Sequence, residues 1–239
     1  AMSPKRVVDE IEYMMDRIGS KGIYFREDNF TVIKSRVMGI CKEIMDRKLD
    51  IEWICESRVD LLTEELVREM SKAGCKSIWF GVESGSQRVL DIIKKDITIE
   101  QTKEAFRLCK KYGIKRGASI MLGIPGETKE EMIQTVKFVE SLDPDYVYWH
   151  AFVGIPGSEL YKVIEEKDLV YDRYEGFILP NTEEMTWPEK VRFVDKASIN
   201  FVMHWRRLPK LILKEIRYKG VRHFIKEVIE YSKKLSSYY

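Results

Sequence analysis

The chain has 239 residues, of which 44% are hydrophobic and 33% charged, and its formal net charge is +2. A chain of this length and composition can bury a large core as one globular protein, and no apolar run approaches the length of a membrane-spanning helix. The sequence also opens without a signal-peptide pattern, so we expect a soluble cytoplasmic protein.

Short apolar runs rich in β-branched and aromatic residues recur along the chain, and longer segments with helical periodicity separate them. The runs are residues 22–25, 50–55, 76–82, 118–124 and 145–153. Continuous apolar runs are typical of parallel strands that are covered on both faces. The pattern therefore predicts repeated βα units, arranged either as an open doubly wound sheet or as a closed or partial barrel.

Helix ends also follow this alternation. Ser3 followed by Pro4 predicts a helix start, and three threonines are each followed three residues later by a glutamate or glutamine, as in a capping box: Thr98, Thr128 and Thr186. Three glycines stand just before predicted strands, where the end of a helix favours a left-handed residue: Gly22, Gly74 and Gly113.

From Trp187 onward the alternation stops, and the pattern predicts a helical tail with breaks at Pro209 and Gly220. Basic residues outnumber acidic ones after Phe201. An ordinary solvated helical face explains this excess. The alternative is that the chain is a non-catalytic binding or scaffold protein whose tail holds RNA or an anionic surface.

The stretch GASIMLGIPGET, residues 117–128, contains three glycines and a proline. It fits neither a P-loop nor a dinucleotide fingerprint, and Glu127 would repel a phosphate. Two interpretations remain open. The glycines form a tight turn between a strand and a helix, or they leave the backbone bare so that a flat, uncharged group such as adenine can lie against it.

Polar residues follow three of the predicted strands, at 26–30, 56–58 and 83–86. Each group either caps the following helix or contributes to one site, because the carboxyl ends of parallel strands meet at one edge. Acids, hydroxyls and an arginine together would suit a zwitterion that carries hydroxyl groups. The four cysteines and three histidines have no metal-ligand spacing, and we expect the cysteines to be buried thiols.

The ordered set SPKRVVDEIEYM, IYFREDNFT, CESRVD, MSKAGCKSIWFGVESGSQRVLDIIKK, GASIMLGIPGETKEEMIQT and GIPGSELY resembles the radical S-adenosylmethionine superfamily over Ser3 to Tyr161. It is most similar to the anaerobic cyclase and methyltransferase group, which often carries a cobalamin-binding domain in front. The resemblance implies a partial (β/α)6 barrel of the TIM type that holds S-adenosylmethionine against a [4Fe-4S] cluster. Residues 1–180 would form the barrel, and residues 181–239 would form a helical extension packed on it.

The resemblance also implies roles for particular residues in binding S-adenosylmethionine. Glu27, Asp28 and Asn29 lie where such enzymes hold the methionyl amine, Glu83 and Ser84 match the segment that meets the ribose and the methionyl part, and Arg58 would assist the carboxylate. The adenine-binding strand corresponds to Gly117, Gly123, Ile124, Pro125 and Gly126. This assignment favours the bare-backbone interpretation of residues 117–128.

One departure from the family pattern bears on activity. The three cluster cysteines, CxxxCxxC, stand on the loop after the family's first strand, and this sequence does not contain them. We therefore expect no metal site in this chain, an incomplete barrel without its first strand, and no radical chemistry by these residues alone. The cluster, and cobalamin where it is used, would belong to an intact parent.

The missing cluster loop has two explanations, a fragment of a longer enzyme or natural loss of the chemistry. Ala1 before Met2 is typical of a cloning remnant, which favours the fragment. An exposed sheet edge would also follow, with self-association, strand exchange or cover by the tail. The substrate is not evident from the sequence.

Overall fold

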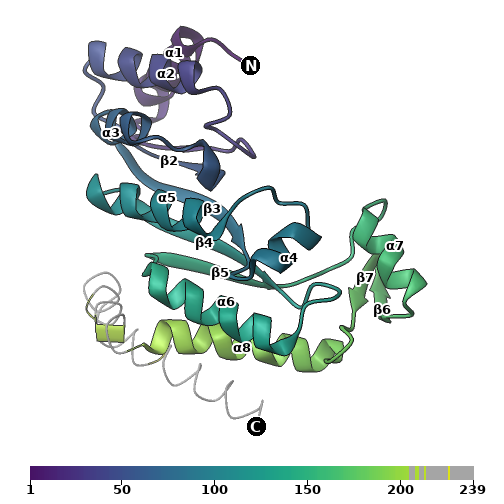
Figure 1. Ribbon diagram of the computed structural model, residues 1–239. Coiled ribbons are helices and arrows are strands. Elements are labelled where there is room, and N and C mark those ends of the chain that lie inside the picture. Colours follow the sequence, from purple (N-terminus) through teal and green to yellow (C-terminus); the bar gives the residue numbers. More distant parts are fainter. Residues whose placement is uncertain (205–207, 210–212, 214–225, 227–239) are drawn as a thin grey trace. The chain divides into compact units, whose positions relative to one another are not determined.

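Five parallel strands, paired in their order along the chain, form the central sheet (Figure 1). The structure is a computed structural model that describes residues 1–204, 208–209, 213 and 226. The strands are β1 (Gly22–Phe25), β2 (Glu52–Ser57), β3 (Cys75–Glu83), β4 (Lys115–Leu122) and β5 (Tyr146–Ala151). All five coincide with predicted runs, and the sheet does not close. The α/β fold with an incomplete parallel barrel is therefore confirmed.

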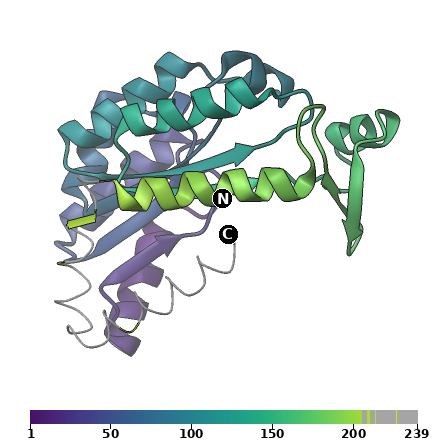
Figure 2. The ribbon, with the colours of Figure 1, turned by 90° about the horizontal axis from the view of Figure 1, so that it is seen from below.

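Helices alternate with these strands, and the first helix precedes β1. They are α1 (Pro4–Ile18), α2 (Lys34–Asp46), α3 (Glu64–Lys72), α4 (Gln87–Ile92), α5 (Ile99–Lys111) and α6 (Lys129–Leu142), with a short 3-10 turn at Val59–Leu61. Each β-helix-β connection crosses over in the same sense, which puts the helices on one face of a parallel sheet. Figure 2 shows these helices along one side of the strands.

The alternation of side chains along β3 shows how the two faces of the sheet differ. Ile78, Phe80 and Val82 are fully buried beneath the helices, and the Phe80 ring lies 5.4 Å from that of Phe106 in α5. The intervening residues, from Ser77 to Glu83, line the opposite face, which is concave. Because successive side chains of a strand point to opposite faces, one strand supplies both the core and the wall of a cavity.

Most of the predicted helix ends are confirmed. The Ser3 hydroxyl accepts from the Arg6 amide, and complete capping boxes start α5 at Thr98 and α6 at Thr128. Gly74 and Gly113 have left-handed φ angles of 93° and 71°. The prediction for Gly22 is wrong: it belongs to β1, and Gly19, at φ 65°, ends α1 instead.

The C-terminal part of the described chain contains elements that the sequence analysis did not predict. After α7 (Glu159–Glu166), strands β6 (Val170–Tyr174) and β7 (Phe177–Pro180) form an antiparallel hairpin. Its turn residues Glu175 and Gly176 have φ angles of 49° and 88°. Two successive left-handed residues are typical of the tight turns that match strand twist.

Helix α8 (Trp187–Met203) begins where the tail was predicted to begin and ends before Pro209. Ala1–Val194 forms one compact unit. The predicted break at Gly220 and nearly all of the basic tail lie outside the described residues. The boundary after residue 180 and the packing of residues 181–239 on the barrel stay predictions.

The first strand of the sheet has one neighbour. Among the described strands, β1 pairs only with β2, so its other side is a sheet edge. Self-association through this edge stays a prediction. Within the described ranges, no helix is both long and apolar enough to cross a membrane.

Candidate functional site

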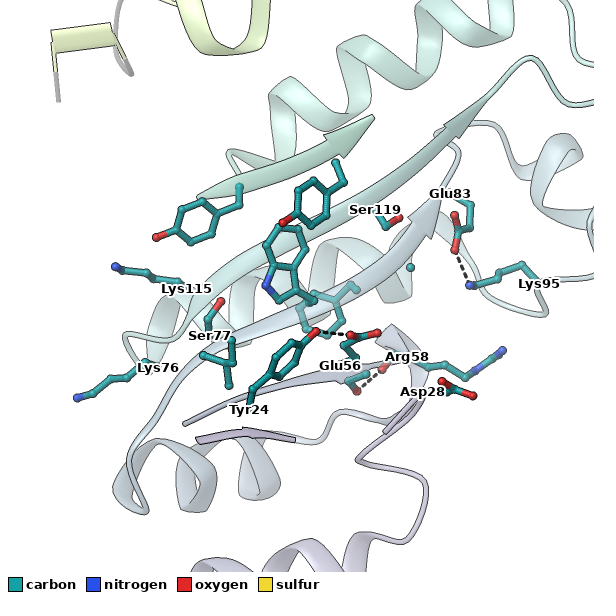
Figure 3. A pocket seen from close by; sticks show the side chains of 17 residues that line it. Tyr24, Asp28, Glu56, Arg58, Lys76, Ser77, Glu83, Lys95, Lys115 and Ser119 are labelled. Atoms are coloured by element: carbon teal, nitrogen blue, oxygen red, sulfur yellow. Dashed lines mark hydrogen bonds and ion pairs between the residues drawn. The ribbon is translucent and has the colours of Figure 1, made fainter. Parts of the chain in front are cut away.

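A cavity of about 760 Å³ lies on the concave face of the sheet (Figure 3). Every strand of the sheet contributes to its lining, with Tyr24 from β1, Ile54 and Glu56 from β2, Trp79 from β3, Ser119 from β4 and Tyr148 from β5. A volume of this size is in the range of small-molecule sites. The cavity therefore has room for a cofactor or a substrate.

Acidic and basic side chains gather at the carboxyl ends of the first three strands. Asp28 follows β1, Glu56 lies near the end of β2, and Arg58 follows β2; all three line the cavity. The Tyr24 hydroxyl donates to Glu56, which raises the pKa of the Tyr24 phenol. The Arg58 guanidinium donates to Asp60 at 2.9 and 3.1 Å. Asp28 makes no hydrogen bond or ion pair through its carboxylate within the described part of the chain.

Glu83 ends β3 in an unusual backbone conformation. Its φ angle is 61°, in the left-handed region that residues with a side chain rarely adopt, and the pairing of β3 with β4 shifts between Gly81 and Glu83. Its carboxylate pairs with Lys95 at 2.8 Å, and a Cβ on Gly81 would lie 2.5 Å from that carboxylate. Gly81 thus leaves room for the Glu83–Lys95 pair at this end of the cavity.

Three other residues predicted to bind the methionyl and ribose groups lie away from the cavity lining. Glu27 forms a two-bond ion pair with Arg36 of α2, at 2.7 and 3.0 Å. The Asn29 side-chain oxygen accepts from Thr31 and from the Arg58 amide at 3.4 Å. These contacts order the β1–α2 loop behind Asp28.

Ser84 is fully buried, and its hydroxyl lies 3.0 Å from that of Thr135 in α6. It also accepts from the Ser86 amide. The structure thus brings Asp28, Arg58 and Glu83 to one cavity and gives Ser84 a packing position between β3 and α6.

The cavity wall opposite Tyr24 is built from aromatic rings. The Trp79 indole stacks on Tyr148 with ring centroids 4.5 Å apart and on Tyr146 at 5.9 Å. A Cβ on Gly117 would lie 2.3 Å from the Trp79 ring, so Gly117 allows the indole to lie flat against β4. We call Trp79, Tyr146 and Tyr148 the aromatic wall.

The segment after β4 forms a tight turn. Pro125 is followed by Gly126 at φ 83°, and the Glu127 amide donates to the Ile124 carbonyl at 2.8 Å, which is the pattern of a type II turn. Ile124 is fully buried in an apolar cluster with Val89 and Phe152. None of these turn residues lines the cavity.

Gly123 has a φ angle of 74°, and a Cβ there would lie 1.8 Å from the Lys190 side chain. Lys190 is fully buried, and its ammonium donates to the carbonyl oxygens of Gly123, Phe152 and Pro180 at 3.0, 3.4 and 2.8 Å. Burial lowers the pKa of Lys190 to about 7. Three carbonyl acceptors match the three donors of an ammonium, so the geometry favours the charged form.

Glu127 lies beneath the same turn. One of its carboxylate oxygens accepts from the amides of Gly123 and Ile124 at 2.6 and 3.1 Å, and the other, Oε1, is buried without a hydrogen-bond partner in the described part of the chain. Burial raises the pKa of Glu127 to about 7. The turn interpretation of residues 117–128 therefore has a structural basis, and adenine binding by these glycines stays a prediction.

The four cysteines are buried free thiols in this fold. Burial raises the pKa of Cys41 and of Cys109 to about 12, and it raises that of Cys75 as well. The described residues contain no group of three or more His, Cys, Asp or Glu side chains arranged to hold a metal ion. The residues described here therefore do not fit an iron-sulfur cluster.

Several lining residues were not among the predicted site residues. Glu56 and Ser57 were recognised only as part of a polar strand end, and Tyr24, Trp79, Lys95 and Tyr148 were not singled out. The signal that could have identified most of them is the period of two along each strand, since Ser77, Trp79, Gly81 and Glu83 alternate with fully buried residues. Lys190 gave no sequence signal, because its partners are backbone carbonyls.

Comparison with known sequences identifies related proteins. The sequence model described as the Radical SAM superfamily matches residues 1–139. An uncharacterized methyltransferase of Pyrococcus horikoshii is 33% identical over 219 residues, which cover 90% of this chain and 47% of that protein. The anaerobic magnesium-protoporphyrin IX monomethyl ester cyclase of Rubrivivax gelatinosus is 32% identical over 171 residues, 71% of this chain and 31% of the cyclase. The chain thus spans less than half the length of these two relatives.

Solved structures share the fold. The apo form of the cobalamin-dependent S-adenosylmethionine radical enzyme OxsB aligns with a TM-score of 0.71 at 15% identity, over 98% of this chain and 41% of that one. The radical S-adenosylmethionine methyltransferase TsrM from Kitasatospora setae, with cobalamin and a [4Fe-4S] cluster bound, aligns at 0.63 and 20% identity, over 73% and 36%. At these identities the likeness concerns the fold alone.

Proposed function

The chain belongs to the radical SAM superfamily, and from that premise we propose that its cavity binds S-adenosylmethionine within a methyltransferase-like or cyclase-like enzyme. Membership of the family implies S-adenosylmethionine and a [4Fe-4S] cluster as cofactors. The observation that carries the proposal is the meeting of Asp28, Glu56, Arg58 and Glu83 at one end of one cavity.

The donor set fits the chemistry of S-adenosylmethionine. The ligand carries an ammonium, a carboxylate, a sulfonium and two ribose hydroxyls, so it needs anionic acceptors near a cationic donor. The Asp28 carboxylate, which has no partner among the described residues, would accept from the ammonium, and the Arg58 guanidinium is the natural partner of a carboxylate. Glu56 and Glu83 are acceptors for hydroxyls and attract the sulfonium charge. The aromatic wall offers a flat surface for the adenine, whereas residues 117–128 would offer their backbone.

In this proposal the residues of this chain bind the cofactor, orient it and exclude water from it. S-adenosylmethionine, when reduced at a cluster, supplies the radical chemistry of the family. The Tyr24 and Lys95 contacts hold Glu56 and Glu83 in fixed positions before the ligand arrives, so less conformational freedom is lost on binding.

We further propose that residues 1–239 do not perform the radical step by themselves, because their four thiols are buried and are not arranged to hold a metal ion. Anaerobic reconstitution followed by iron and sulfide assays tests this: stoichiometric cluster in the purified chain would contradict it. Cobalamin enters the proposal only for a complete enzyme, through the fold shared with TsrM and OxsB.

Calorimetric titration of the purified chain tests the binding site directly. We expect S-adenosylmethionine to bind about tenfold more tightly than S-adenosylhomocysteine, which lacks the sulfonium charge. The double variant Glu56→Gln, Glu83→Gln should lose this preference, because these two carboxylates attract the sulfonium charge. Glu64→Gln is the matched control, since Glu64 pairs with Lys111 on the surface, away from the cavity lining. No binding at millimolar ligand by a chain with intact circular dichroism would contradict the proposal.

A further inference from the structure

The end of the cavity opposite the acidic residues has a different chemistry. Lys76 and Lys115 line this end, at the starts of β3 and β4, and Figure 3 shows them on either side of Ser77. In the register of the sheet, Ser77 is the direct neighbour of both Ile54 and Lys115. The amino ends of the strands therefore place two lysines and a hydroxyl along the same end of the cavity lining. We call Lys76, Ser77 and Lys115 the basic end of the cavity.

Ser77 is an unexplained polar group at this end. The residue is only 6% exposed, and its hydroxyl oxygen is buried without a hydrogen-bond partner among the residues that the structure describes. A buried hydroxyl without a partner reduces the stability of the fold, and the great majority of such groups in proteins are satisfied. An alanine or valine would suit this position of a strand better. The hydroxyl thus points to a ligand that supplies the missing partner.

The two lysines differ in the neutralising charge around them. Lys76 lies 3.5 Å from Glu52, a pair that is more than half exposed on both sides. Lys115 makes no ion pair with any residue that the structure describes, and its ammonium lies 5.9 Å from the centre of the Tyr146 ring. This end therefore carries net positive charge, in contrast to the carboxylates at the other end. Three donors without a full set of acceptors suit an anionic group.

The aromatic wall begins at the same place. Tyr146 pairs with Gly117, two residues along β4 from Lys115, and the stack continues through Trp79 to Tyr148, which is 60% exposed. Exposed aromatic faces inside a cavity favour contact with flat or apolar ligands. A molecule that extended from the basic end along this wall would reach the carboxyl ends of the strands, where the sulfonium cofactor is proposed to bind.

We propose that the basic end binds the anionic group of a second ligand, a carboxylate attached to a flat apolar body that lies along the aromatic wall. The carboxylate contacts the ammonium groups of Lys76 and Lys115 and accepts from the Ser77 hydroxyl. That this ligand is the substrate rests on the proposed function, whereas its binding does not. The cavity is then bipolar, with the cofactor at the acidic end and the substrate anchored at the basic end.

The probe for this site is 2-naphthoate, with the neutral 2-naphthamide as its isosteric comparison, both titrated by calorimetry into the purified chain at low ionic strength. We expect the amide to bind at least about tenfold more weakly, because it lacks the charge that the lysines attract. Lys76→Met and Lys115→Met should each weaken naphthoate binding about threefold, and together they should reduce it to the level of the amide. Lys103→Met, a lysine of similar exposure on α5, is the control and should have no effect.

Ser77→Ala separates a binding role from a structural one. Removal of an unsatisfied buried hydroxyl should leave the melting temperature unchanged or raise it, while naphthoate affinity falls about fivefold. Equal binding of the acid and the amide, or unchanged naphthoate affinity in the double lysine variant, would overturn the proposal. Titration of the same variants with S-adenosylmethionine keeps the two proposals distinct, since we expect that affinity to change less than twofold.

Discussion

The carboxyl ends of β2 and β3 differ sharply from the turn after β4, although both were predicted to bind the same cofactor. At the first two strand ends, Glu56 and Glu83 lie in an open cavity and are each held by one neighbouring side chain. At the turn after β4, the space above Gly123 is filled by Lys190, and Ile124 is part of an apolar cluster.

This difference shows that a glycine, although it has no side chain, does not necessarily leave its backbone accessible to a ligand. Gly81 makes room for the Glu83–Lys95 pair, Gly117 for the Trp79 ring and Gly123 for Lys190. In all three cases the neighbour that the missing Cβ admits is a side chain of this chain. A glycine-rich strand end therefore indicates close packing. Whether the packing partner is a ligand or a side chain depends on whether that strand end lines a cavity.

Substitution of Gly123, in the turn after β4, has the largest expected effect on the free energy of unfolding. Gly123→Ala adds a Cβ at a left-handed φ of 74° and 1.8 Å from Lys190, whose three hydrogen bonds prevent it from moving aside. We expect the free energy of unfolding to fall by about 4 kcal/mol, from backbone strain and overpacking together.

Gly126→Ala is the matched variant, because Gly126 also has a positive φ but only one atom, 3.8 Å away, near the added Cβ. A loss of about 1–2 kcal/mol is expected there. Urea denaturation of both variants measures the difference. Equal losses would mean that Lys190 does not fill the space above Gly123.

The buried carboxylate beneath the same turn gives a smaller, pH-dependent effect. The pKa of Glu127 is raised from 4.5 to about 7 by burial, so the folded state holds a proton that the unfolded state releases between these values. Its contribution to stability is full below pH 4.5 and is lost as the pH rises through about 7. Lys190 and Glu131 are the charged groups that act on it.

We therefore expect the free energy of unfolding to fall by about 2 kcal/mol between pH 5 and pH 8 through Glu127 alone. Glu127→Gln should remove this part of the slope, and the difference between variant and wild type in urea denaturation at several pH values measures it. A variant whose pH profile parallels that of the wild type would show that Glu127 is ionised throughout.

The fold was largely predictable from the sequence, and the reason lies in local patterns. Apolar runs, capping boxes at Thr98 and Thr128, and the glycines before β3 and β4 are all encoded within a few residues. The error at Gly22 came from the short gap between α1 and β1, where Gly19 already ends the helix. The β6–β7 hairpin was missed because its alternation is weak and its turn, Glu175–Gly176, is not a typical pair.

The site was predictable only in part, because its contacts join distant segments. Asp28, Arg58 and Glu83 follow predicted strands, and the convergence of parallel strand ends brings them together. The pairing of Glu27 with Arg36, of Ser84 with Thr135 and of Gly123 with Lys190 depends on tertiary packing across as many as 67 residues. No local pattern distinguishes a side chain that faces the cavity from one that faces a helix.

Glu83→Gly has the smallest expected effect on stability, and it tests the strand end of β3 in the way that Gly123→Ala tests the turn after β4. Glycine relieves the left-handed backbone at φ 61°, while the unfolded chain gains entropy and the part-buried pair with Lys95 is lost, so these contributions nearly cancel. We expect the free energy of unfolding to change by less than about 1 kcal/mol, and the affinity for S-adenosylmethionine to fall about tenfold, since a carboxylate is removed from the acidic end. Lys95→Met is the control, because it breaks the same ion pair and keeps the carboxylate. An unchanged calorimetric affinity in Glu83→Gly together with a lowered affinity in Lys95→Met would mean that the strained backbone at the end of β3 serves packing alone. The carboxyl ends of β2 and β3 would then not differ in kind from the turn after β4.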